Sequence, residues 1–445
     1  MNMQTSAKPG TASRPSDQSG HGTIFPASHR ALFALVTVLF FLWGMSNNLT
    51  DILVQQFKKS FELTQFSAQL VQTANFLGYF CMAIPAAVMM RRWGYKVGMI
   101  TGLGTFGLGM ILFWPAAAAG KYLPFLIALF VVGSGASILE TACNPFMAQF
   151  GTPATSERRL NFAQSFNPPG TILGVIIGAN FIFSGIELKQ PQIAALRLAG
   201  TYGMYLHGEL MRVVPTYVVL GIVVLSVGLL LSRMQFPSIA SEGESEDRGS
   251  FRALLHYPHF WFAVLANFCN VGAQVATWSS LIPYMKQFTG VSERVAAGYL
   301  TATLVALSLG RFFGTQLMKY VSAHQLLGVY AAINVILLGF AMTHPGMNGA
   351  YAIVVSSFFL SIMFPTTFAL GIKGLGANTK LAGSFLVMAV AGGAVFPPIL
   401  GLIARQTGSV AKGYIVPLLG YLAVALYGFG ARWIMAHDIG RIENQ

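Results

Sequence analysis

Two carboxylates lie inside long apolar stretches of the sequence, and they are the residues best placed to do chemistry. The chain has 14 Asp and Glu residues, and twelve of them lie in tails or short polar connections. The other two are Asp51, within the apolar run 31–57, and Glu140, within the run 122–150. A carboxylate in hydrocarbon is costly, so such residues usually face a bundle interior or wet cavity and mark ion or substrate pathways. The alternative is a structural acid that bonds to neighbouring backbone or to Arg311.

An aromatic side chain and two amides accompany Asp51 at helical spacing. Trp43, Asn47 and Asp51 recur every four residues, and Asn48 is next to Asn47. Residues four apart share one face of an α-helix. One face of this run is therefore predicted to carry an aromatic surface, amides and an acid.

Glu140 has polar neighbours of the same kind. Asn144 follows it by four residues, and Asn161, Gln164 and Asn167 follow one another at three-residue intervals in the next apolar run, which is close enough to place them in one stripe of a helix. Amides, carboxylates and aromatic surfaces together suit a neutral polyhydroxylated molecule, because each sugar hydroxyl can both donate and accept a hydrogen bond. Bonding between helices is the alternative for any single amide. It is the favoured interpretation for three others, at Asn75, Asn180 and Asn334.

The composition places the chain in a membrane. Hydrophobic residues make up 54% of the 445 residues and charged residues 9%, with a mean hydropathy of +0.62. A soluble domain has about 25% charged residues, and a membrane-spanning helix needs about 20 predominantly apolar residues. The sequence predicts twelve spans, at 31–57, 66–90, 97–117, 122–150, 160–184, 212–233, 257–286, 294–318, 326–343, 348–372, 380–404 and 412–435.

The net charge of +13 does not indicate nucleic-acid binding, because the basic residues are dispersed among the loops instead of forming a stripe. With the amino end taken as cytoplasmic, sixteen Lys and Arg residues lie in tails and loops on that side and ten on the other. Such an excess is the usual orientation signal, so both termini are predicted to be cytoplasmic. None of the soluble segments is large enough to be a catalytic unit.

Cysteine usage and the amino end exclude two other classes. Cys81, Cys143 and Cys269 all fall within predicted spans, without the ligand spacings of a metal site or a disulfide framework. The region 1–29 is rich in Ser, Pro, Gly and Thr, and we expect it to be disordered. It is not a signal peptide, because the apolar run after it is too long and has no small-residue cleavage pattern.

The chain is predicted to consist of two six-helix halves that resemble each other weakly. An offset of 228 residues places Gly44 on Gly272, and Arg91 at the end of span two on Lys319 at the end of span eight. Such matches favour two parallel repeats with a central site between them. Gly and Pro interrupt spans five and eleven, at 167–170 and 389–398; paired interruptions of this kind suggest gating helices, and helix packing is the equally weighted alternative. The expected domains are a tail (1–29), a first bundle (30–233), a linker (234–255), a second bundle (256–436) and a second tail (437–445).

At this level of detail the sequence resembles the fucose–proton symporter group of the major facilitator superfamily, from about residue 31 to residue 434. The motifs that carry the resemblance are 41–51 (FLWGMSNNLTD), 139–146 (LETACNPF), 159–167 (RLNFAQSFN), 271–278 (VGAQVATW) and 370–376 (LGIKGLG).

The resemblance implies roles for individual residues. The acid matching Asp51 takes part in proton exchange, and the acid matching Glu140 in sugar recognition and coupling. Amides line the polar wall of the cavity, at the positions of Asn48, Gln164 and Asn167. The sequence departs from the pattern at Pro168-Pro169 and at Met363-Phe364, where the group has Ser-Phe and Gln-Tyr. The missing Tyr hydroxyl does not change the predicted class of transporter, but it leaves the particular sugar undetermined.

The sequence therefore predicts an all-α polytopic membrane protein with the twelve-helix major facilitator fold. Its expected function is proton symport of a neutral monosaccharide, with L-fucose first, across the inner membrane of a bacterium. Glucose, galactose or an N-acetyl amino sugar is the alternative within the family, and efflux by antiport is an alternative outside it. We expect a monomer in the lipid bilayer with no cofactor besides the coupling proton, no nucleic-acid partner and no enzymatic activity. The expected substrate-binding residues are Trp43, Asn47, Asn48, Glu140, Asn144, Gln164, Asn167, Gln274 and Phe364, and the expected proton-coupling residues are Asp51 and Glu140.

Overall fold

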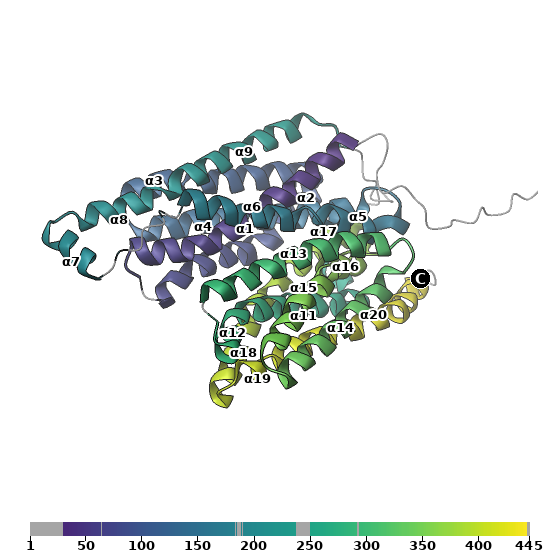
Figure 1. Cartoon of the computed structure of the whole chain (residues 1–445). Helices are drawn as coiled ribbons and strands as arrows, with labels where there is room; N and C mark the ends of the chain where they lie inside the picture. Colours follow the sequence, from purple (N-terminus) through teal and green to yellow (C-terminus); the bar gives the residue numbers. More distant parts are fainter. Residues whose placement is uncertain are drawn as a thin grey trace, which may run out of the picture.

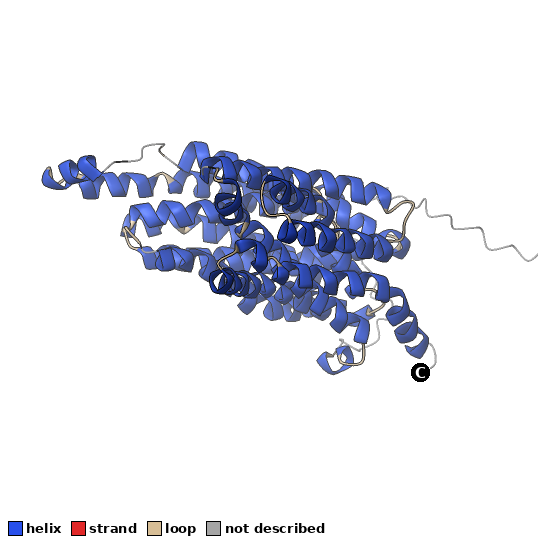
Figure 2. Cartoon of the chain, turned by 60° about the horizontal axis from the view of Figure 1, so that its bottom comes forward, coloured by secondary structure: helices blue, strands red, loops and turns tan. Residues whose placement is uncertain are grey.

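The computed structural model describes residues 30–63, 65–182, 184, 188, 190–236, 250–291 and 293–442. Nearly all of these residues are helical, and no strand occurs among them (Figure 2). The predicted all-α class is therefore confirmed. The predicted tail 1–29 and much of the predicted linker lie outside the described residues.

The first six predicted spans correspond to helices α1 to α9. Span one is α1, spans two and three are α2 with α3, and span four is α4. Span five is divided between α5, α6 and a π-helical segment, and span six is α9. The bounds are α1 Arg30–Ser60, α2 Gln65–Ile111, α3 Phe113–Ala119, α4 Tyr122–Gln149, α5 Ser156–Gln164, α6 Asn167–Ile177, the π-helical segment Gly178–Ile182, α7 Gln190–Leu198, α8 Tyr202–Met211 and α9 Val213–Arg233.

The second six spans correspond to helices α11 to α20. Span seven is α11 with α12, span eight is α13, span nine is α14, and span ten is α15 with α16. Span eleven is α17 and α18 joined by a 3₁₀ turn, and span twelve is α20. The bounds are α10 Phe251–Leu254, α11 Pro258–Ser279, α12 Leu281–Thr289, α13 Glu293–Leu317, α14 Ala323–Thr343, α15 Met347–Leu360, α16 Met363–Gly371, α17 Thr379–Met388, the turn Ala389–Ala391, α18 Gly392–Thr407, α19 Val410–Gly413 and α20 Ile415–Ile442.

Eight helical stretches of the described chain are long and apolar enough to cross a membrane by themselves. One of them, Leu70–Ala119, holds two predicted spans, because the backbone turns at Gly94 with φ 79° and ψ 175°. Only glycine adopts such a φ without strain. The three predicted spans outside these stretches are the first, fifth and eighth, which hold Asp51, the amides at 161, 164 and 167, and Arg311 respectively.

The fifth span is broken where the sequence has its Pro-Pro pair. Helix α5 ends at Gln164, and α6 begins at Asn167, so that Pro168 and Pro169 occupy the first turn of the new helix. Proline is tolerated there because the first amides of a helix have no intrahelical partner. The departure from the family pattern at these two residues therefore coincides with a helix start.

Helix α1 packs tightly on this broken span. A Cβ atom on Gly44 would collide with the carbonyl oxygen of Asn167, and one on Gly170 would collide with the carbonyl oxygen of Phe41. Small residues at such positions let two membrane helices approach closely. These two contacts set the position of α1 along its axis relative to the start of α6.

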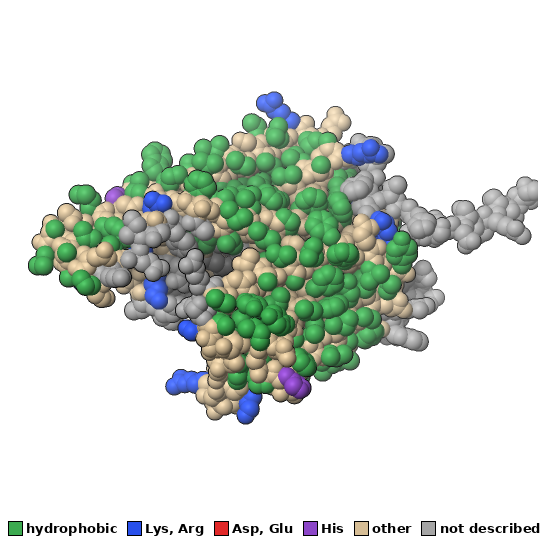
Figure 3. Space-filling view, in the orientation of Figure 1, with side chains coloured by type: hydrophobic (Ala, Val, Ile, Leu, Met, Phe, Trp, Pro, Cys, Tyr) green, Lys and Arg blue, Asp and Glu red, His purple; other side chains and the backbone are tan. Residues whose placement is uncertain are grey.

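The helices form two groups that lie side by side, α1–α9 and α11–α20 (Figure 1). Helix α17 contacts α2 and α4, while α13 and α16 contact α5. Helices α7 and α8 extend beyond the rest of the first group, at the end opposite to the C-terminus (Figure 1). Apolar side chains cover most of the flank, and most of the visible Lys and Arg lie towards its two ends, as a membrane-embedded protein requires (Figure 3).

Candidate functional site

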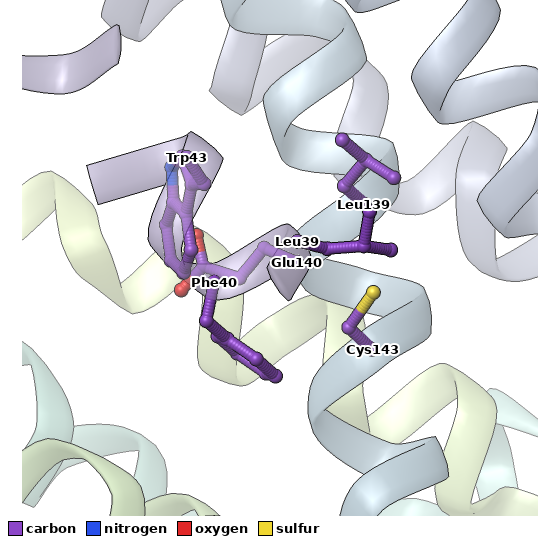
Figure 4. Close-up of a pocket in the computed structure, with 6 residues that line it drawn as sticks. All are labelled: Leu39, Phe40, Trp43, Leu139, Glu140 and Cys143. Atoms are coloured by element: carbon purple, nitrogen blue, oxygen red, sulfur yellow. The ribbon is translucent and has the colours of Figure 1, made fainter. Parts of the chain in front are cut away.

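A small pocket with a cavity volume of about 10 Å³ lies between α1 and α4. Figure 4 shows its walls, to which α1 contributes aliphatic and aromatic side chains and α4 contributes a carboxylate and a thiol. The lining residues are Leu39, Phe40, Trp43, Leu139, Glu140 and Cys143. The pocket thus joins one of the two predicted acids to the predicted aromatic surface.

Glu140 is the buried acid of this pocket. The residue is 2% exposed, and its Oε2 atom has no hydrogen-bond partner among the described residues. A buried polar atom without a partner is rare in native proteins and is often matched by a water, an ion or a ligand. Glu140 therefore has a free acceptor facing an otherwise apolar pocket.

Two amides near Glu140 are bonded to each other: Asn144, one helical turn further along α4, and Gln164 on α5. Gln164 Nε2 donates a hydrogen bond of 2.9 Å to Asn144 Oδ1, which joins α5 to α4. Both residues are buried, and Asn144 Nδ2 has no partner among the described residues. The structure thus brings together three of the predicted site residues, although only Glu140 lines the pocket itself.

Trp43 is held in place by a neighbouring helix. Its Nε1 donates a hydrogen bond of 2.6 Å to the hydroxyl of Tyr79 on α2, and its ring lies 6.2 Å from the ring of Phe40. A polar tip that is bonded in this way fixes the ring plane. Trp43 therefore offers the pocket an aromatic surface of fixed orientation.

The remaining predicted binding residues lie outside this pocket. The Asn167 side chain donates a hydrogen bond of 3.1 Å to the carbonyl oxygen of Phe40, so its amide N–H₂ group is used to join α6 to α1. Gln274 on α11 and Phe364 on α16 are both half-buried in the second group of helices. The Phe364 ring packs 6.2 Å from that of Phe368.

The predicted residues Asn47, Asn48 and Asp51 lie on the helical backbone of α1, but their side chains lie outside the described part of the structure. Their roles remain predictions from spacing and family resemblance.

Hydrogen bonds join the two groups of helices close to this site. Arg311 on α13 is buried, donating from Nη1 to the carbonyl oxygen of Gln164 at 2.8 Å and from Nε to that of Ser361 at 2.8 Å. Asn161 on α5 donates to Thr366 Oγ1 on α16 at 2.9 Å. Asn161 thus connects the two groups of helices and lies outside the pocket wall.

An ion pair extends these contacts to the end of the molecule predicted to be cytoplasmic. Lys373, just after α16, lies 2.8 Å from the carboxylate of Glu157 at the start of α5. The Glu157 side chain is 8% exposed and that of Lys373 is 42% exposed. At this end the two groups of helices are therefore held together by charge as well as by hydrogen bonds.

A buried arginine fixes the corner between α4 and α5. Arg159 is fully buried, and burial lowers the pKa of its guanidinium to about 10. It donates to the carbonyl oxygens of Met147 and Ala148 at the end of α4 and to Thr155 Oγ1. A cation among the last carbonyl groups of a helix is favourable. This corner joins the helix that carries Asn144 to the helix that carries Gln164.

Sequence reasoning missed several residues of the site. Cys143 follows Glu140 by three residues and Leu39 precedes Trp43 by four, so helical spacing alone could have indicated them. The partnership of Trp43 with Tyr79 spans 36 residues between two helices and has no local signal in the sequence.

Comparison with known families agrees with the fold. A family model described as the Major Facilitator Superfamily matches residues 33–397. The L-fucose-proton symporter of Escherichia coli (strain K12) is 39% identical over 401 residues, covering 89% of this chain and 92% of that protein. The Glucose/galactose transporter of Brucella abortus biovar 1 (strain 9-941) is 31% identical over 400 residues, covering 89% of this chain and 93% of that protein.

Solved structures give the same result. The crystal structure of the major facilitator superfamily transporter FucP in the outward conformation matches with a TM-score of 0.84 and 38% identity, covering 91% of this chain and 99% of that one. The proton:xylose symporter XylE, bound to 6-bromo-6-deoxy-D-glucose, matches with a TM-score of 0.65 at 15% identity, covering 91% of this chain and 96% of that one. The second match is a likeness of fold alone.

Proposed function

The chain belongs to the Major Facilitator Superfamily, and we propose that it carries a neutral monosaccharide across the bacterial inner membrane together with a proton. The observation that carries the proposal is the buried carboxylate of Glu140, whose Oε2 has no partner among the described residues, in a pocket shared with Trp43. An acid accepts hydrogen bonds from sugar hydroxyls, and an aromatic ring packs against the apolar face of the sugar ring. The protein works as a monomer and needs only the proton as a coupling ion.

Each predicted residue has a part in this proposal. Asp51 exchanges the proton, and Glu140 couples protonation to sugar binding because it can do both. Asn144 and Gln164 present amides behind Glu140, and their mutual hydrogen bond supports this arrangement. Phe364, from the second group of helices, packs against the apolar side of the sugar. Four further amides complete the proposed site, Asn47, Asn48, Asn167 and Gln274.

L-fucose is the first candidate substrate. The relative with 39% identity over most of the chain is an L-fucose-proton symporter. A 6-deoxyhexose has an apolar methyl group, which suits an aromatic ring without a hydroxyl at Phe364.

Glucose or galactose is the second candidate. Two relatives, 31% and 32% identical over similar lengths, are named Glucose/galactose transporter and Putative glucose/galactose transporter. The same Phe364 leaves the site without the hydroxyl that would select between the two kinds of sugar.

Transport proceeds by alternating access, in which the two groups of helices rock around a central site. The ion pair Glu157–Lys373 and the bonds made by Arg311 and Asn161 all join the two groups on one side of the pocket. These contacts support a state that is closed towards the cytoplasm. The likeness to FucP in the outward conformation supports the same state.

Counterflow in proteoliposomes tests the proposal. Vesicles loaded with one unlabelled sugar are diluted into the same sugar in radiolabelled form, for L-fucose, galactose, glucose and an N-acetyl amino sugar. We expect exchange of L-fucose and of at least one hexose, and accumulation above the equilibrium level when the outside is made acidic. Exchange without any response to the pH gradient would contradict proton coupling, and no exchange of any of these sugars would contradict the substrate class.

A further inference from the structure

Arg311 on α13 is a buried cation that bonds to backbone carbonyl oxygens. The residue is 6% exposed, and its guanidinium donates to the carbonyl oxygens of Gln164 and Ser361, each at 2.8 Å. No carboxylate pairs with it among the described residues. A buried charge is costly unless it is compensated, so these two carbonyl groups have an important part in stabilising the guanidinium.

Both carbonyl groups lie at the end of a broken helix. Helix α5 ends at Gln164, and α15 ends at Leu360 with Ser361 as its C-cap. The last carbonyl groups of a helix have no intrahelical partner and carry a partial negative charge. One cation therefore binds the C-terminal ends of two helices, one from each group.

A proline follows each of the two carbonyl groups by four residues. Within an α-helix, a carbonyl oxygen accepts a hydrogen bond from the N–H group four residues later, and proline has no N–H group. Gln164 is followed at that distance by Pro168, and Ser361 is followed by Pro365. The two prolines therefore leave both acceptors available to Arg311.

The bridge made by Arg311 lies between the pocket and the end of the molecule predicted to be cytoplasmic. Arg311 is nearer to that end of α13 than to the other. The side chain of Gln164 is bonded to Asn144, which is one turn nearer than Glu140 to the same end of α4. When the two groups rock apart on the cytoplasmic side, the two carbonyl groups separate, and one guanidinium cannot keep both bonds.

We propose that Arg311 is a positioning residue of the transport cycle, which holds the cytoplasmic side closed by bridging these two carbonyl groups and gives up one bond when that side opens. The inference rests on the proposed function and adds the residue that sets the balance between its two states. Hydrogen bonds from a charged donor are stronger than those between neutral groups. The planar guanidinium has five donors in a fixed fork, whereas the ammonium of lysine is a compact point charge.

The first test is Arg311→Lys, which keeps the charge but not the fork of donors. Half-saturating concentrations of labelled L-fucose, or of the sugar that the parent exchanges best, are measured for uptake from the outer side and for efflux from the cytoplasmic side. Apparent affinity falls with the fraction of molecules that are in the binding state. Arg311→Lys should therefore raise the value for uptake roughly fivefold or more and lower the value for efflux, whereas a purely structural defect would weaken both.

Arg159→Lys is the matched control. Arg159 is also buried and also donates to backbone carbonyl oxygens, but those acceptors, at Met147, Ala148 and Thr152, all belong to the first group of helices. The change should therefore not move the values for uptake and efflux in opposite directions. Opposite shifts of similar size in both arginine variants would overturn the assignment.

The second test restores a missing N–H group. Pro168→Ala gives the carbonyl group of Gln164 a backbone donor that competes with Arg311, and Pro169→Ala makes the same chemical change four residues after Ser165. Pro168→Ala should shift uptake and efflux in the same directions as Arg311→Lys, and combining the two should add little. In the Pro169→Ala background, Arg311→Lys should keep its full effect. If the lysine variant does not fold, the two proline variants carry the test, because both keep Arg311.

Thermal unfolding in detergent without sugar shows whether each variant is folded. Parallel changes in uptake and efflux for Arg311→Lys, or equal effects of the two proline variants, would overturn the role of Arg311 alone. A parent protein that transports none of the sugars in either direction would overturn the proposed function together with it.

Discussion

Gln164 bonds to Asn144 through its side chain, at 2.9 Å, and this bond joins α5 to the helix that carries Glu140. The carbonyl oxygen of Gln164 accepts a hydrogen bond of 2.8 Å from Arg311 on α13. One residue therefore links the polar wall of the first group of helices to a buried guanidinium of the second. A movement of one group relative to the other would change this wall, as coupling of binding to alternating access requires.

Replacing Gln164 with Ala should weaken sugar binding by about tenfold. The change leaves Asn144 without its donor, and a buried group that loses its partner costs roughly 1–3 kcal/mol. Glu140→Ala should have a larger effect, because it removes the acceptor and the titrating group together. Asn180→Ala is the control, since Asn180 is exposed and its side-chain amide donates to the carbonyl oxygen of Ile176, four residues earlier. Binding measured by the sugar-induced rise in melting temperature would contradict the prediction if Gln164→Ala and Asn180→Ala behaved alike.

Helical spacing correctly predicted which residues share a face where those residues lie on one unbroken helix. Glu140 and Asn144 are four residues apart, and an unbroken α4 places both on its buried side. Asn161, Gln164 and Asn167 were expected to form one stripe, but the helix breaks between Gln164 and Asn167. The broken helix lets these amides serve three different contacts.

Contacts between distant helices could not be predicted in this way. Arg311 reaches the carbonyl oxygen of a residue 147 positions away, and Asn161 bonds to a residue 205 positions away. Periodicity tells which face of a helix is buried, but it does not tell which helix covers that face. A hydrogen bond to a backbone carbonyl group cannot be predicted from residue types, because every residue has such a group.

Asp51→Asn should abolish proton-driven accumulation while leaving exchange of sugar in place. The amide has the shape of the protonated acid but cannot release a proton. Counterflow should therefore stay within severalfold of the parent, while uptake against a gradient at acidic outside pH should be lost. Accumulation by this variant to the level of the parent would show that Asp51 does not carry the coupling proton.

The ion pair between Glu157 and Lys373 should affect the rate of transport, because it joins the two groups of helices at the end predicted to be cytoplasmic. A partly exposed pair is worth up to about 1 kcal/mol, so the single reversals Glu157→Lys and Lys373→Glu should slow uptake severalfold. The double reversal should recover most of the rate, because the charges are again opposite. The surface pair Glu62–Arg197, within the first group of helices and about half exposed on each side, serves as the control. Reversal of that pair should leave uptake unchanged, and a double reversal at Glu157–Lys373 no better than the single changes would contradict the prediction.

Phe364→Tyr should change the choice of sugar more than the rate of transport. Phe364 is half-buried and packs against Phe368, so its ring can stay in place when the hydroxyl is added. In the parent protein the bare ring cannot bond an extra sugar hydroxyl, and we expect L-fucose and galactose to compete within about one or two orders of magnitude. The added hydroxyl should shift the ratio of their half-saturating concentrations, with thermal stability close to that of the parent. Competition by both sugars against labelled L-fucose measures the ratio. A parent protein that binds only N-acetylated sugars, with neither L-fucose nor galactose competing, would refute the expectation and favour an amino sugar as the substrate.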